Sequence, residues 1–152
     1  MRFVTIRVIA VFVAIVACAI GCRFSILAAD PEPIRTQTDF SAFWKQFRSA
    51  VIAGDKAKVA EMTKFPLSIG YLEKPVKNKQ QFLRRYDEIF KGEASAAQCF
   101  PSAKPHQQSA RQYDVYCPFK ETPNDWENAP IRFIFELNKS GWKFAGLDNV
   151  NE

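Results

Sequence analysis

The segment FSAFWKQFRSAVIAGDKAKVAEMTKFPL, residues 40–67, decides the fold. Its first half carries five large apolar side chains at helical spacing, namely Phe40, Phe43, Trp44, Phe47 and Val51. At 3.6 residues per turn they form one stripe, and the polar residues between them occupy the other side. Each aromatic ring buries roughly 150–250 Å² when it is packed. The stripe therefore predicts a helix that needs a broad apolar surface to cover it.

Short polar residues and a glycine mark the expected ends of this helix and of the next one. Thr38 or Asp39 can accept a hydrogen bond from a free backbone N–H of the first turn. Gly54 suits the left-handed position after the last turn. Asp55 can then cap a shorter helix over residues 56–63.

The rest of the chain carries one more helical pattern and a series of strand patterns. Helical spacing predicts a third helix over residues 79–90, with Asn78 as its cap. Alternation predicts strands over residues 67–72, 93–100, 111–119, 131–137 and 142–147, and the segments 101–109 and 121–130 are expected to be loops. Helices followed by such a run of strands predict an α+β fold: three N-terminal helices packed on a curved antiparallel sheet.

The N-terminus is typical of a signal peptide. Arg2 and Arg7 precede an uncharged apolar run of 13 residues, 8–20, whereas a membrane-spanning helix needs about 20. The small residues that end at Ala29 predict cleavage there. Lipidation at Cys22, within a sequence similar to a lipobox, and an uncleaved anchor are the alternatives. The expected organisation is a signal peptide over 1–29, an extended tether over 30–38 and one α+β domain over 39–152.

Loss of the leader changes the charge of the protein. The full chain has a formal charge of +5, but residues 30–152 carry 18 basic and 16 acidic residues in scattered positions. A basic stripe is the usual signature of a nucleic-acid interface, and none is present in the sequence. We expect an exported protein, periplasmic or secreted, that contacts a membrane only through its leader or a lipid anchor and does not bind nucleic acid.

Two cysteines remain after the leader, Cys99 and Cys117. An even pair in an oxidising compartment predicts a disulfide, which would stabilise the fold by roughly 3 kcal/mol for a loop of this length. An alternative is a nucleophile–base pair of Cys99 with His106, the only histidine. One histidine and no close cysteine pair provide no ligand set for a metal, so neither a metal nor another cofactor is expected.

The order of elements resembles the nuclear transport factor 2-like superfamily, a cone-shaped, cystatin-like α+β fold shared with ketosteroid isomerase. The resemblance covers residues 39–148 and lies in the segments FSAFWKQFRSAVIAGDKAKVAEMT, KNKQQFLRRYDEIF and RFIFELNKSGWKFAGLD. Among its members the chain looks most like exported bacterial domains of unassigned function. The resemblance implies that the cone binds or converts a small apolar molecule, or that its shell contacts another protein.

Four residues are candidates for lining a pocket. A likeness to ketosteroid isomerase would require a carboxylate and a phenol inside the cone, and Asp114, Tyr71 and Tyr86 are the available groups. We expect Asp114 to point away from the helices and to be exposed to solvent, because it alternates with apolar neighbours. Trp126 lies in a polar loop, where it could contact a partner or pack locally. No catalytic residue is assigned.

Three functions remain open from the sequence. The first is an exported, non-catalytic module of the bacterial cell envelope that binds an unknown protein or a small apolar ligand. The second is a small acid–base enzyme, an isomerase or dehydratase, that uses the cone. The third is a domain that dimerises through the outer face of its sheet, where Tyr116 and Ile134 are the apolar residues.

Overall fold

The computed structural model describes residues 39–72 and 74–151. The predicted leader, its two alternative processing sites and the tether lie outside the described residues. The described helices are α1 (Phe40–Ile52), α2 (Lys56–Glu61), α3 (Lys79–Lys91) and α4 (Ala96–Cys99). The strands are β1 (Thr63–Ile69), β2 (His106–Ser109), β3 (Gln112–Cys117), β4 (Ile131–Asn138) and β5 (Gly141–Asn149).

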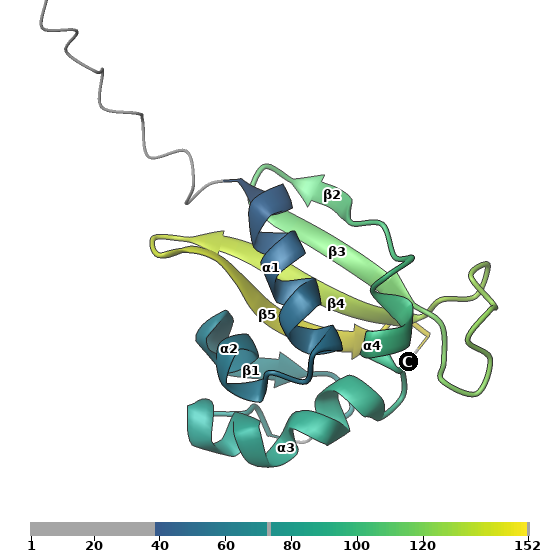
Figure 1. Ribbon diagram of the computed structural model, residues 1–152, viewed down its shortest axis with the longest axis horizontal. Helices are drawn as coiled ribbons and strands as arrows, with labels where there is room; N and C mark the ends of the chain where they lie inside the picture. Colours follow the sequence, from purple (N-terminus) through teal and green to yellow (C-terminus); the bar gives the residue numbers. More distant parts are fainter. Residues whose placement is uncertain (1–38, 73, 152) are drawn as a thin grey trace, which may run out of the picture. The chain divides into compact units, whose positions relative to one another are not determined.

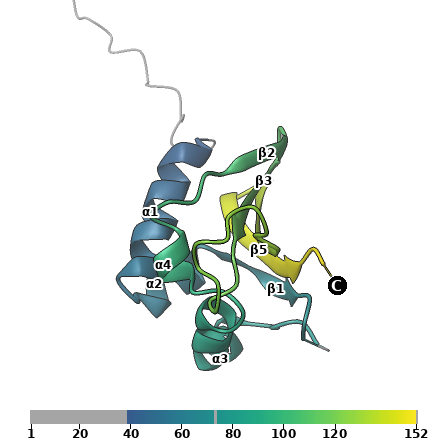
Figure 2. The ribbon, with the colours of Figure 1, turned by 90° about the vertical axis from the view of Figure 1, so that its right-hand side faces the viewer.

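The five strands form one sheet in the order β1-β5-β4-β3-β2. Neighbouring strands are antiparallel except for β1, which pairs with β5 in parallel. Figures 1 and 2 show α1, α2 and α4 on one side of the sheet and α3 beside its β1 end. The predicted α+β class is confirmed, but the sheet is mixed rather than wholly antiparallel.

The helix ends follow the expected capping. Asp39 Oδ1 accepts from the backbone N–H of Ser41 at 2.8 Å, and Asp55 Oδ1 accepts from that of Lys58 at 2.9 Å. Gly54 has a φ of 68°, the left-handed conformation that glycine adopts most readily. These local bonds satisfy backbone donors that the first turn of each helix leaves free, so they fix where α1 and α2 begin.

The largest differences from the expectation are in three segments. Residues 93–100 are not a strand, because their Ala-Ala-Gln-Cys sequence favours the short helix α4. The expected loop 101–109 contains β2, a short edge strand whose polar, exposed residues carry no apolar alternation. The first strand begins at Thr63 rather than Leu67, and it tolerates Pro66 because β1 is the edge of the sheet.

Aromatic rings fill the space between the helices and the sheet. Phe47 of α1 is fully buried, and its ring centroid lies 5.1 Å from that of Phe135 and 5.6 Å from that of Phe144. Phe90 of α3 and Phe133 of β4 continue the cluster, with centroids 6.0 Å apart. The stripe expected on α1 therefore packs against the inner faces of β4 and β5.

A β-bulge divides the hairpin formed by β4 and β5. Phe135 pairs with Phe144, but the preceding Ile134 pairs with Gly146, so β5 has one extra residue between these pairs. Successive side chains of a β-strand point to opposite faces of the sheet. Beyond the extra residue, each side chain therefore points to the face opposite to the one that unbroken alternation would give. Phe144 and Leu147, three positions apart, are consequently both buried in the core.

We expect Trp44→Ala to lower the free energy of unfolding by about 3–5 kcal/mol, because it removes a large buried side chain from a packed core. Trp44 is 7% exposed, and its ring centroid lies 4.9 Å from that of Phe100. Urea denaturation followed by circular dichroism measures the change. Gln46→Ala, an exposed position on the same helix, is the control and is expected to shift stability by less than about 0.5 kcal/mol. Equal midpoints for the two variants would contradict the packing described for α1.

Candidate functional site

A cleft of about 290 Å³ lies between α4 and the segment that follows β3. Trp126, which is 43% exposed, lines it, together with Phe119. Large apolar side chains exposed beside a hollow are typical of surfaces that contact a ligand or partner. This cleft, called here the Trp126 cleft, is the candidate functional site.

The segment that carries Trp126 is held at several points. The backbone N–H of Lys120 donates to the carbonyl of Glu93 at 2.9 Å, and the N–H of Val150 donates to the carbonyl of Pro130 at 3.0 Å. Within the segment, Asp125 Oδ1 accepts from the N–H of Asn128 at 3.1 Å. These bonds order a connection that has no helix or strand of its own, so the indole is presented from a fixed backbone.

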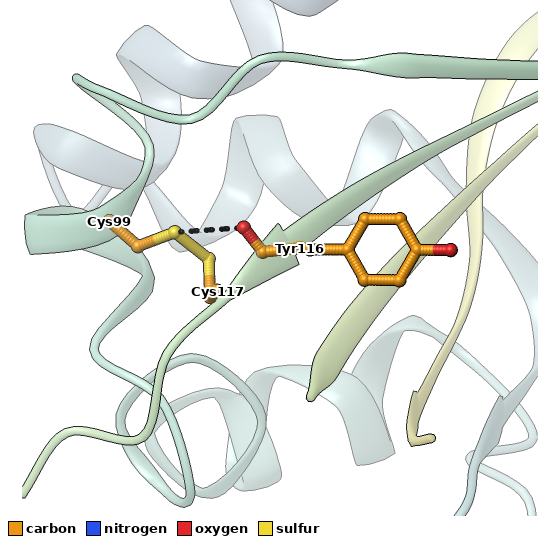
Figure 3. The surroundings of a disulfide bond; sticks show 3 residues. All are labelled: Cys99, Tyr116 and Cys117. Atoms are coloured by element: carbon orange, nitrogen blue, oxygen red, sulfur yellow. Dashed lines mark hydrogen bonds between the residues drawn. A yellow bond between two sulfur atoms is a disulfide. The ribbon is translucent and has the colours of Figure 1, made fainter. Parts of the chain in front are cut away.

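The predicted disulfide joins Cys99 at the end of α4 to Cys117 at the end of β3, with their Cα atoms 5.7 Å apart (Figure 3). Cys99 Sγ lies 3.6 Å from the carbonyl oxygen of Tyr116. A disulfide sulfur has no hydrogen to donate, so this is a packing contact. Because Cys99 is bonded to Cys117, the alternative pairing with His106 as nucleophile and base is wrong. Cys99 also lines the Trp126 cleft, and the disulfide therefore fixes one wall of it.

The polar side of the cleft consists of neutral side chains and one ammonium group. Ser95, Gln98, Ser102 and Asn124 supply hydroxyl and amide groups, and Lys120 supplies the charge. The hydroxyl of Ser95 makes no capping bond to α4, although it occupies the capping position. Within the described part of the chain, none of the four neutral side chains has a hydrogen-bond partner in the protein.

Asp114 does not have the exposure expected from the sequence. It points away from the helices, as its alternation with Tyr113 and Val115 requires, but it is 0% exposed. Its Oδ1 accepts from Gln112 Nε2 at 3.0 Å, and its Oδ2 lies 3.7 Å from Arg132 Nη1. The prediction of a solvent-exposed carboxylate is therefore wrong, because neighbouring side chains on the outer face cover it.

Arg132 links two carboxylates across the outer face of the sheet. Its Nε and Nη2 donate to the two carboxylate oxygens of Asp148, at 2.9 and 2.6 Å. These hydrogen bonds raise the pKa of the Arg132 guanidinium above its ordinary value. Since Arg132 is paired on both sides, the cluster holds the guanidinium in one orientation rather than leaving it free for an anion.

Of the two candidate tyrosines, Tyr86 belongs to α3 and Tyr71 lies beside it, away from the outer face of the sheet. The hydroxyl of Tyr71 donates to the carbonyl of Glu88 at 3.0 Å, and burial, followed by the carboxylates of Glu93 and Glu88, raises its pKa to about 12. Tyr86 is buried within α3, where burial likewise raises its pKa to about 12. Both phenols are therefore neutral at physiological pH.

The four predicted pocket residues do not form one group. Trp126 lines the cleft beside α4, Asp114 lies on the outer face of the sheet, and the tyrosines lie near α3. The polar residues of the cleft were not predicted from the sequence, because they come from two separate segments, 95–102 and 118–126, that the disulfide and the backbone bonds bring together. The Cys99–Cys117 pairing was the one available signal.

Among the described residues, no group of three or more His, Cys, Asp or Glu side chains is placed to hold a metal ion. No helix within residues 39–72 and 74–151 is long and apolar enough to cross a membrane.

The comparisons with known proteins give only distant likenesses. No protein-family model matches the chain, and no curated protein matches it. A domain of unknown function with a cystatin-like fold from Nostoc punctiforme is similar in structure, with 12% identity and a TM-score of 0.40 over 73% of this chain and 74% of that one. LinA is similar at 12% identity and a TM-score of 0.38, over 76% and 84% of the two chains.

A third similar structure is described as an association domain of calcium/calmodulin-dependent protein kinase II from Xanthomonas campestris. It has 14% identity and a TM-score of 0.40, over 83% of this chain and 93% of that one. Likenesses at this level of identity carry no information about ligand, partner or activity.

We expect Arg132→Met to destabilise the protein by about 3 kcal/mol, because it leaves the buried Asp114 carboxylate without its counter-charge. Adding Asp114→Asn to that variant is expected to restore part of the loss, since the amide is neutral and its oxygen can still accept from Gln112. Chemical denaturation measures all variants. Lys64→Met, which breaks the exposed pair of Lys64 with Glu136, is the control and is expected to cost less than about 1 kcal/mol. An Arg132→Met effect no larger than this control would show that the buried carboxylate does not need the guanidinium.

The stability of the protein is expected to fall between pH 10 and pH 12. Tyr71 and Tyr86 keep their protons to about pH 12 in the folded state, whereas in the unfolded chain they ionise near 10. The unfolded state then binds fewer protons, so stability is lost as the pH rises through this window. Denaturation at stepped alkaline pH, with phenolate absorbance recorded in parallel, tests this. Tyr71→Phe is expected to remove one of the late-ionising phenols; an unchanged absorbance titration would contradict the assignment.

Proposed function

We propose that the protein is an exported, non-catalytic binding module of the bacterial cell envelope, a member of the nuclear transport factor 2-like superfamily, which binds its partner at the Trp126 cleft. The observation that carries the proposal is a large exposed indole on a connection held by a disulfide and backbone hydrogen bonds. An ordered aromatic anchor loses little conformational entropy on binding, which is why Trp is common at the centre of interfaces.

The filled interior favours binding at the surface over catalysis between the helices and the sheet. A ligand in that space would have to displace buried rings such as Phe47, Phe100 and Phe144. General acid–base chemistry also needs titratable groups within hydrogen-bond reach of one substrate. Asp114 and Tyr86 lie on opposite sides of the sheet, so they do not converge on a common substrate.

Export rests on the sequence of the leader and is supported by the disulfide. Arg2, Arg7 and the apolar run of residues 8–20 are typical of a signal peptide, with release after Ala29 or lipidation at Cys22. Disulfides persist in oxidising compartments, which fits a periplasmic or extracellular location. The membrane would then be contacted only through a lipid anchor or an uncleaved leader.

Sedimentation with cell envelopes tests the proposal. The full chain is expressed with its own leader in a bacterial host, and the mature protein from the periplasm is mixed with washed envelopes and centrifuged. We expect the wild type to sediment with the envelopes and Trp126→Ala to bind about 30-fold more weakly, the loss typical of an interface anchor.

The matched control is Ile52→Ala, which also removes a large exposed apolar side chain but lies outside the cleft. Ile52→Ala is expected to sediment as the wild type does. Failure of the chain to leave the cytoplasm, or equal sedimentation of the wild type and Trp126→Ala, would overturn the proposal. The intact mass of the purified protein also distinguishes cleavage after Ala29 from lipidation at Cys22.

A further inference from the structure

We infer that the Trp126 cleft binds a saccharide and prefers one that carries a carboxylate. This inference rests on the proposed binding function and names the chemical class of its ligand. Three properties of the cleft support it: the apolar wall, the neutral polar groups and the single charge among the described lining residues.

The apolar wall is built around the indole. Trp126 and Phe119 line the cleft together with Pro118 and Pro123. The face of an aromatic ring carries partial negative charge, and the axial C–H bonds of a sugar ring carry partial positive charge. A flat indole can therefore stack on the C–H face of a pyranose and remove both apolar surfaces from water.

The neutral polar groups match the edge of a sugar ring. A sugar hydroxyl both donates and accepts hydrogen bonds, and so do the hydroxyls of Ser95 and Ser102 and the side-chain amides of Gln98 and Asn124. These four side chains have no partner within the described part of the protein, so they can bind a ligand without first breaking an internal bond. The combination of one indole with several uncharged groups of this kind fits a polyhydroxyl ligand.

The single charge in the lining sets the preference for an acidic sugar. Among the described residues that line the cleft, Lys120 is the only one with an ionised side chain, and none has a carboxylate. Its ammonium lies 3.7 Å from Glu121 Oε1, but both side chains are exposed, so that pairing is weak. A carboxylate on the ligand could therefore replace Glu121 as the partner of the Lys120 ammonium group.

A peptide fits the cleft less well. An extended peptide usually binds by adding a strand to the edge of a sheet, whereas the walls of this cleft are α4 and residues 118–126. A proline-rich peptide, which could stack on Trp126 without pairing to a strand, is included as an outcome of the test.

Quenching of tryptophan fluorescence by acrylamide tests the inference on the mature, exported protein. Trp44 and Trp142 are 7% and 6% exposed, so the quenchable emission comes from Trp126. The probes are chitotriose, which is neutral, the disaccharide of N-acetylglucosamine and N-acetylmuramic acid, which carries a carboxylate, and decaproline. We expect both sugars to protect Trp126 from acrylamide, with the acidic sugar binding up to about fivefold more tightly at low salt.

Two variants test the charged group and the neutral polar groups separately. Lys120→Gln is expected to abolish the preference for the acidic sugar, so that the two sugars bind with equal affinity. Gln98→Ala with Asn124→Ala is expected to weaken both sugars alike. Because protection is measured first on the wild type, the result does not depend on whether a variant folds.

Absence of protection by both sugars, or protection by decaproline alone, would overturn the inference. The proposed function would still stand if sedimentation with envelopes depended on Trp126. Protection by the sugars without any sedimentation would instead overturn the proposed envelope binding while the saccharide site remained. A preference for the acidic sugar that survives Lys120→Gln would overturn the role given to that residue.

Discussion

The packing of one ring, Phe135, against the stripe of α1 is the contact on which the rest of the structure depends. Its centroid lies between 5.1 and 5.9 Å from those of four aromatic residues of that helix: Phe40, Phe43, Trp44 and Phe47. A core of this kind is as densely packed as an organic crystal, so a helix seated on it has little freedom to shift. With α1 fixed, one face of the sheet is covered, and sites for a ligand are left at the ends of elements and on the outer face.

Much of the fold could be predicted because its local signals agree with its packing. The helices begin or end at Asp39, Gly54, Asp55 and Asn78, where the capping residues were expected. The bulge in β5 could not be predicted in this way. If the pairing of Asn138 with Gly141 continued along the hairpin without a bulge, Arg132 would lie opposite Leu147, a core residue. The extra residue moves Asp148 into that position instead, and a charged pair forms where none was expected.

The candidate functional site could likewise be predicted only in part from the sequence. Trp126 was recognisable as an aromatic residue in a polar loop, and the Cys99–Cys117 pairing followed from the count of cysteines. Which groups surround the indole depends on how α4 and residues 118–126 are brought together, and residues 93–100 were expected to form a strand. A strand would have directed Gln98 and Cys99 to opposite faces, whereas a short helix turns both toward the cleft.

The position of β5 in the sheet bears on when the protein can fold. It is the last strand of the chain, yet it lies between β1 and β4, and its pairing with β1 joins residues roughly 80 positions apart. Contacts this distant in sequence are slow to form, and here they require the C-terminal residues to be present. A chain that passes through a narrow pore with its N-terminus first would carry β1 unpaired until β5 followed. The topology thus delays closure of the sheet until β5, the last of the described strands, is free to insert between β1 and β4.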